Sequence, residues 1–82
     1  MKTLTTVEKT IIKILAHILH KPLHYILPRK QFYTELPMDA TDYLLTLVEI
    51  EQRFQVDIPD RVAFGFRNAR EIANYLSGRK AA

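Results

Sequence analysis

The sequence predicts an all-α fold, a four-helix bundle with three longer helices, one short helix and a long first loop. Apolar residues recur at the three- and four-residue spacing of a helix along three separate stretches. A residue that can cap a helix precedes each stretch, and a proline or glycine follows it. The 82 residues are 48% hydrophobic, which is enough apolar material for one small core. We therefore expect residues 1–82 to form a single helical domain.

The first helix is expected from Met1 to His20. Thr5 and Glu8 have the three-residue spacing of a capping box, in which each side chain bonds the backbone N–H of the other residue. Pro22 lacks a backbone donor and disfavours continuation of the helix. The apolar face predicted for this helix consists of Val7, Ile11, Ile12, Ile14, Leu15, Ile18 and Leu19.

The next segment, residues 21–38, contains three prolines and no sustained period. A stretch of this length without regular structure is unusual in a compact domain. Its large apolar side chains are nevertheless too numerous for a mobile linker. We therefore expect a packed loop with a short helical turn, lying over the bundle. The apolar residues of this loop are Leu23, Tyr25, Ile26, Leu27, Phe32, Tyr33 and Leu36.

The best-defined helix follows Asp39, whose carboxylate can accept the free N–H groups of a first helical turn. Its opposite faces are an apolar stripe and a polar side that includes one leucine. A leucine among carboxylates on an exposed face indicates a docking surface, although single exposed leucines are common in proteins. The stripe contains Tyr43, Leu47, Ile50 and Phe54, extended by Leu44 and Val48; the polar side contains Asp42, Thr46, Glu49 and Arg53, with Leu45 among them.

A short helix is expected at residues 60–64. Pro59 can start it, because the N–H that proline lacks would be unpaired at that position anyway. Gly65 is expected to end it.

The last helix is expected to begin at Asn68, which has capping-box spacing to Glu71. Gly78 is the expected C′ residue, and residues 79–82 are expected to fray. Ile72, Tyr75 and Leu76 form its packing stripe. Together the stripes predict a core that includes Ile11, Leu15, Ile18, Leu44, Leu47, Phe54, Ile72 and Leu76.

Charge is unevenly distributed along the chain. Residues 1–34 have six Lys or Arg and one Glu, residues 35–60 have seven acids and one Arg, and residues 61–82 have five basic residues and one Glu. The acidic central helix would repel phosphates, so a basic nucleic-acid-binding helical domain is the less favoured alternative. An acidic helix instead suits a protein partner with Lys or Arg around a small apolar pocket.

Several other function classes lack the residues they need. There is no cysteine, hence no disulfide, thiolate metal site or thiol nucleophile, and no Ser-His-Asp set or glycine-rich phosphate loop, so we expect no enzyme activity. His17, His20 and His24 could share a metal ion, but a proline intervenes and no carboxylate completes the set, so no metal site is expected. No signal pattern is present at the N-terminus, and no stretch approaches the ~20 apolar residues that span a bilayer, so we expect a soluble, cytoplasmic protein. We also expect it to be monomeric when alone.

Residues 39–60 resemble the recognition helix of acyl carrier proteins. Asp39-Ala40-Thr41 stands where that family has its D-S-L motif, and the match continues without a gap to Phe54 and to Ile58-Pro59-Asp60. The resemblance is specific over this stretch and weaker from the first helix to Leu76. It implies a four-helix carrier fold, in which a long first loop is usual.

The resemblance also implies partners. It implies that the helix after residue 40 is presented to synthases, ketoreductases, dehydratases and phosphopantetheinyl transferases of a fatty-acid or polyketide-type pathway. By position, the implied partner-binding residues are Asp42, Leu45, Val48, Glu49 and Gln52.

One residue departs from the family in a way that bears on chemistry. The family's serine carries the 4′-phosphopantetheine arm, and Ala40 stands in its place, so the chain as written is expected to carry no cofactor. Thr41 is a poor substitute, because one residue rotates its hydroxyl by about 100° around the helix.

Two explanations of Ala40 stay open. In the first, the native residue at position 40 is serine, and an engineered alanine blocks attachment to an otherwise working carrier. In the second, the alanine is native, and the chain is a degenerate carrier-like interaction domain that never carries an arm. Thr41, Leu45 and the basic ends of the chain, all off the family pattern, favour degeneration. The acidic helix and the intact Ile58-Pro59-Asp60 favour a blocked carrier, which is the interpretation we prefer.

Overall fold

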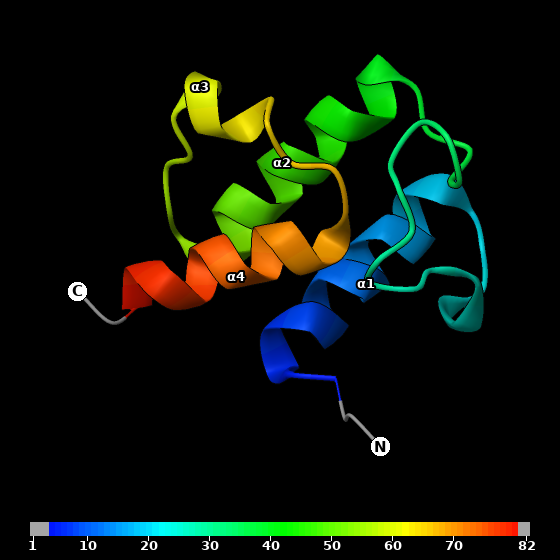
Figure 1. The fold of residues 1–82 in the computed structure, drawn as a ribbon, viewed down its shortest axis with the longest axis horizontal. Coiled ribbons are helices and arrows are strands. Elements are labelled where there is room, and N and C mark those ends of the chain that lie inside the picture. The colour runs from blue at the N-terminus through cyan, green and yellow to red at the C-terminus, as the bar shows by residue number, and fades with distance from the viewer. Residues whose placement is uncertain (1–3, 81–82) are drawn as a thin grey trace.

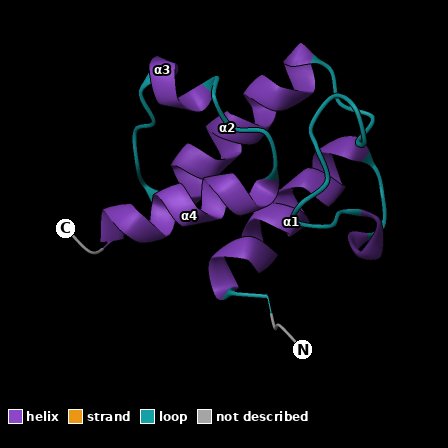
Figure 2. Ribbon diagram, viewed as in Figure 1, coloured by secondary structure: helices purple, strands orange, loops and turns teal. Residues whose placement is uncertain are grey.

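The computed structural model describes residues 4–80, with side chains described through residue 78, and every regular element in that range is a helix (Figure 2). In chain order the elements are α1 (Thr6–Leu19), a 3-10 helix η1 (Leu23–Tyr25), α2 (Ala40–Phe54), α3 (Asp60–Ala63) and α4 (Ala69–Lys80). Helix α1 packs against both α2 and α4, and η1 lies beside α1 (Figure 1). The predicted all-α bundle with three longer helices, one short helix and a long first loop is confirmed.

Helix α1 begins with the capping box that the sequence predicts. The N–H of Glu8 donates to Oγ1 of Thr5 at 3.1 Å, and the N–H of Thr5 donates to Oε1 of Glu8 at 3.0 Å. The helix therefore begins at Thr6, later than predicted, while residues 1–3 lie outside the described part of the chain. At the other end, His20 adopts the left-handed conformation with φ 55°, which closes the helix.

The long first loop is packed, as predicted, and it is fastened to the start of α4. The N–H of Phe32 donates to the carbonyl oxygen of Arg67 at 2.8 Å, and the N–H of Arg70 donates to that of Pro28 at 3.0 Å. These two bonds join segments far apart in the sequence. The buried side chains of the loop are Ile26, Phe32, Leu36 and Met38.

The core contains most of the residues that the sequence predicts for it. Ile18 and Phe54 are only partly buried, and Leu44 is half-exposed, so its assignment to the core is wrong. The predicted core residues that are buried are Ile11, Leu15, Leu47, Ile72 and Leu76.

The error at Leu44 comes from the rotation of α2 about its axis. Relative to Tyr43, Thr46 lies about 60° to one side and Leu44 about 100° to the other. Thr46, predicted on the polar side, is fully buried, and its hydroxyl donates to the carbonyl oxygen of Asp42 at 2.8 Å. That bond satisfies the hydroxyl and so permits its burial; with Thr46 facing the core, Leu44 lies outside.

Helix α3 begins after Pro59 and is followed by Gly65, in agreement with the sequence prediction. A buried side chain fastens it to α2, because the hydroxyl of Tyr43 donates to the carbonyl oxygen of Ala63. Burial raises the pKa of Tyr43 to about 12, with smaller contributions from the neighbouring Tyr33 and Glu71. The phenol therefore stays protonated and able to donate at any physiological pH.

Helix α4 begins where predicted but does not end there. The N–H of Glu71 donates to Oδ1 of Asn68 at 2.9 Å, whereas the carboxylate of Glu71 accepts the N–H of Arg67 rather than closing a capping box. The helix continues through Gly78, which has no positive φ, so the prediction of a C′ glycine is wrong. The backbone of residues 79 and 80 is helical, and residues 81 and 82 of the predicted frayed tail lie outside the described part.

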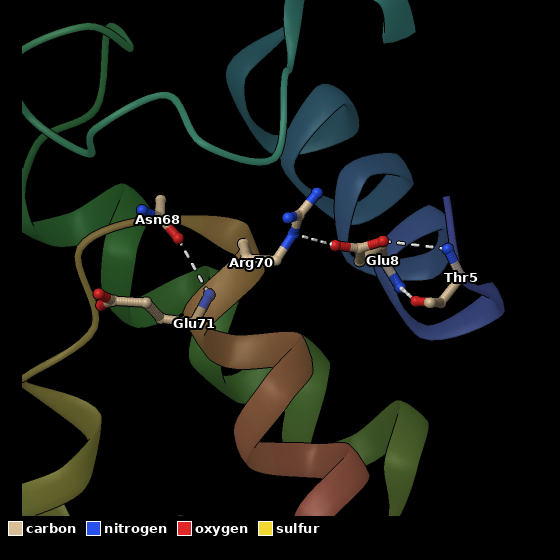
Figure 3. A network of polar contacts seen from close by, with 5 residues as sticks. All are labelled: Thr5, Glu8, Asn68, Arg70 and Glu71. Carbon is tan, nitrogen blue, oxygen red and sulfur yellow. Dashed lines mark hydrogen bonds and ion pairs between the residues drawn. The ribbon is translucent and has the colours of Figure 1, made fainter. Parts of the chain in front are cut away.

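A buried ion pair joins the beginnings of α1 and α4 (Figure 3). Nε of Arg70 donates to Oε2 of Glu8 at 2.5 Å, and Glu8 is only 5% exposed. The hydrogen bond from the N–H of Thr5 lowers the pKa of Glu8 below its ordinary 4.5, and the guanidinium of Arg70 lowers it further. Burial of the carboxylate acts in the opposite direction. The carboxylate of Glu8 thus caps its own helix, α1, and also binds Arg70 of α4.

Candidate functional site

The start of α2 presents a short exposed segment on a fixed backbone. Oδ1 of Asp39 accepts the N–H of Asp42 at 2.8 Å, and Oδ2 of Asp42 accepts the N–H of Asp39 at 3.2 Å. This reciprocal capping box agrees with the predicted cap at Asp39 and sets where the helix begins. Ala40 is the first helical residue, and both it and Thr41 are exposed.

Residue 40 is therefore accessible but chemically inert. Its methyl group cannot form a phosphodiester, so the residues present do not fit a covalently attached 4′-phosphopantetheine arm at this position. The hydroxyl of Thr41 is exposed but lies about 100° further around the helix.

Tyr33, an aromatic residue that the sequence placed in the packed first loop but not at the site, borders this segment. Tyr33 has a left-handed φ of 72°, its side chain is exposed, and its ring centroid is 5.8 Å from that of Tyr43. Partial burial and the nearby charge of Asp39 raise the pKa of Tyr33. No sequence signal could have placed Tyr33 beside residue 40, because large side chains rarely adopt positive φ and loop packing decides which do.

The outward face of α2 carries an apolar strip, which consists of Leu44, Leu45 and Val48. Leu45 is 51% exposed, and the other two are exposed to a similar degree. Gln52 continues the same side of the helix and is exposed. The predicted single leucine is thus one of three adjacent apolar side chains, which form a contiguous surface rather than an isolated exposure.

Acidic residues flank the apolar strip on both sides. Asp42 and Glu49 are partly exposed along one edge, where Glu49 pairs with Arg53 at 3.8 Å. On the other edge Oε2 of Glu51 accepts the N–H of Ile58 at 2.9 Å, which gives Glu51 a structural role. The structure therefore brings the five predicted partner-binding residues onto the exposed side and edge of α2: Asp42, Leu45, Val48, Glu49 and Gln52.

A shallow hollow of about 360 Å³ extends this surface beyond the C-terminal half of α2. Val48 and Gln52 line one side of it, and Val56 and Asp57 line the other. The apolar strip thus adjoins a mostly polar concave region where a partner side chain has room to enter.

The three histidines do not form a metal site in the part of the chain that the structure describes. No group of three His, Asp or Glu residues between positions 4 and 80 could hold an ion. His17, His20 and His24 are all exposed.

With this geometry in place, comparison with known proteins identifies the family. A family model described as "Phosphopantetheine attachment site" matches residues 9–76, which include all of α2 and most of the other helices. The chain belongs to the acyl carrier protein family. The resemblance inferred from residues 39–60 is thereby confirmed, and it extends over most of the sequence.

Individual relatives agree with this assignment. An acyl carrier protein of Rickettsia bellii (strain RML369-C) is 27% identical over 81 residues, which cover 99% of this chain and 94% of the relative. One from Syntrophobacter fumaroxidans is 32% identical over 72 residues, covering 88% and 89%. A mitochondrial acyl carrier protein of Saccharomyces cerevisiae is 38% identical over 47 residues, covering 57% of this chain and 38% of the relative.

Membership settles several coarser points. Acyl carrier proteins are carriers rather than enzymes, their family cofactor is 4′-phosphopantetheine, and they interact with synthase-type enzymes. Within residues 4–80, no helix is both long and apolar enough to cross a bilayer.

Proposed function

We propose that this chain is an acyl carrier protein of a fatty-acid or polyketide-type pathway that docks on its partner enzymes through α2 but carries no arm, because residue 40 is alanine. The observation that supports this most directly is the exposed Ala40 at the capped start of α2, beside the apolar strip. The alternative is a degenerate carrier-like interaction domain that never carries an arm.

The chemistry of α2 indicates what a partner must offer. The apolar strip needs a small apolar pocket, and the flanking acids Asp42 and Glu49 need Lys or Arg around that pocket. Opposite charges speed the encounter and set the orientation, while burial of the leucines supplies most of the affinity. Synthases, ketoreductases, dehydratases and phosphopantetheinyl transferases are the partner classes proposed.

The attachment position is tested by restoring the missing nucleophile. Incubated with coenzyme A and a broad-specificity phosphopantetheinyl transferase, the chain with Ala40 is expected to gain no mass. Ala40→Ser is expected to gain one arm, as the serine Oγ forms a phosphodiester and coenzyme A releases 3′,5′-adenosine diphosphate. The free N–H groups at the helix start favour an incoming phosphate. Intact-mass spectrometry reads both outcomes.

Controls separate the explanations. Ala40→Ser combined with Thr41→Val should still gain one arm, since Thr41 is not the expected acceptor. A mass gain by the chain with Ala40 would assign the reaction to Thr41 and contradict the proposal. A folded Ala40→Ser variant that several transferases leave unmodified would favour the degenerate interaction domain.

The docking surface is tested without any modification. Binding of the chain with Ala40 to an immobilised transferase is expected to weaken about five- to thirty-fold for Leu45→Ser, which corresponds to about 1–2 kcal/mol for an interface residue. Leu27→Ser is the matched control, because Leu27 is exposed to the same degree but lies in the first loop. Glu49→Lys should slow association and reduce its dependence on salt. Equal losses for Leu45→Ser and Leu27→Ser would refute docking through α2.

A further inference from the structure

A second concavity, which is apolar, lies away from α2, between α1 and the first loop. It has a volume of about 560 Å³, within the range typical of small-molecule sites. Ile12 and Ile26, both buried, form its floor. Leu23 and Leu27 form its walls, and both are more than half exposed. We call this concavity the α1–η1 groove.

The groove is bordered by positive charge. Lys9 and Lys13, one helical turn apart on α1, line it together with His24. The exposed lining is almost wholly apolar although two lysines contribute to it, so their carbon stems form wall while the ammonium groups stand at the edge. Neither lysine has an ion pair among the described residues.

No acid is available to neutralise the groove from the nearby sequence. Residues 9–34 contain no Asp or Glu, and Glu8 is buried against Arg70. Lys13 also borders a separate hollow that Glu49 lines, so the carboxylate of Glu49 partly offsets the charge of Lys13. Lys9 does not line that hollow.

We propose that the α1–η1 groove binds a single-chain fatty carboxylate, with its alkyl tail on the isoleucine floor and its carboxylate at Lys9 and Lys13. A tail needs an apolar concavity, and its head needs a point charge at the edge; the groove supplies both. No arginine lines the groove, so a carboxylate head would be held by the point charges of two lysines rather than by a bidentate guanidinium. The concave floor suits one inserted chain better than a flat membrane surface.

This binding does not depend on the proposed docking function. The groove is built from α1 and the first loop, and no residue of α2 lines it. It needs neither a nucleophile at residue 40 nor a partner enzyme. A chain that offers no covalent attachment at Ala40 would in this way hold an acyl chain without a covalent bond.

The test is calorimetric titration of the full chain with octanoate, decanoate and dodecanoate, each below its micellar concentration. Each added methylene that enters the groove is expected to tighten binding about four-fold, the factor equivalent to about 0.8 kcal/mol per buried CH₂. Leu27→Glu is expected to abolish binding, because it places a carboxylate in the wall. Lys9→Glu is expected to weaken binding at least ten-fold.

Leu45→Glu is the matched control, because Leu45 is 51% exposed and Leu27 is 54% exposed, and the two lie on different elements. It is expected to bind dodecanoate like the parent chain. Circular dichroism of each variant checks that the helices are retained.

Four results would overturn the proposal. Leu27→Glu and Leu45→Glu could lose binding equally, which would indicate a site elsewhere. Dodecyltrimethylammonium could bind as tightly as dodecanoate, which would exclude recognition of the head by lysine. Binding to vesicles containing anionic lipid, without binding to monomeric dodecanoate, would make the groove a membrane contact. Dimerisation without dodecanoate binding would make it an interface between copies.

Discussion

Replacing Arg70 by methionine is expected to lower the free energy of unfolding by about 3 kcal/mol at pH 7, because it leaves the carboxylate of Glu8 buried without its cation. Breaking a buried ion pair costs about 3–5 kcal/mol, and the lower end applies here since the side chain of Arg70 is 25% exposed. Glu8 also keeps the N–H of Thr5. A domain of this size has a total stability of about 4–12 kcal/mol, so the loss is large.

The decrease in unfolding free energy caused by Arg70→Met should depend on pH. The lowered pKa of Glu8 determines the direction of that dependence. A carboxylate whose folded pKa lies below its ordinary 4.5 contributes stability above that pH, and the contribution disappears as pH falls through the folded pKa. Arg70→Met removes the guanidinium that helps to lower the pKa of Glu8, so its free energy of unfolding should fall less in acid than that of the parent. The difference in unfolding free energy between the parent and the variant should therefore become smaller as the pH falls.

Urea denaturation followed by circular dichroism, at pH 7 and about one unit below the ordinary pKa of glutamate, measures both effects. Arg67→Met is the matched control, because its pair with Glu71 is 3.3 Å long and the arginine side chain is 76% exposed. Such an exposed pair should contribute less than about 1 kcal/mol. Equal losses for the two variants at pH 7, or a loss for Arg70→Met that stays constant in acid, would refute the reasoning.

Two further predictions concern helix ends. His20→Gly should stabilise the protein by about 0.5–1 kcal/mol and raise its Tm by about 3–6 °C, because His20 has a left-handed φ of 55° that glycine adopts without strain; an unchanged or lower Tm in a thermal melt would contradict this. Gly78→Ala should stabilise by about 0.5 kcal/mol, because Gly78 lies inside α4 and an added Cβ meets nothing within 4 Å. A destabilised Gly78→Ala variant would instead support the C′ role that the sequence indicated.

The sequence predicted those features that short-range chemistry decides. Thr5 with Glu8, and Asp39 before α2, lie within one helical turn of their partners, and both caps form. The five predicted partner-binding residues lie together on α2 because a helix fixes their relative directions once it forms. The resemblance to acyl carrier proteins was noted on the same helix, and the family match over residues 9–76 then confirmed it.

Features that depend on packing between distant segments were missed. The burial of Thr46 needs a backbone carbonyl to satisfy its hydroxyl, and a pattern that counts threonine as polar turns α2 the wrong way. The partner of Glu8 lies 62 residues away at Arg70, so nothing near Glu8 signals a buried ion pair. The α1–η1 groove likewise exists only once the first loop has folded onto α1.

The fastening of the first loop to the beginning of α4 has a consequence for the order of folding. Phe32, Arg70 and Glu8 all acquire their final hydrogen bonds only when the segment that begins at Arg67 has arrived. Closing such long stretches of chain is entropically costly and is offset only by contacts made late. We therefore expect the first loop to reach its final packing late in folding, when α4 docks against it.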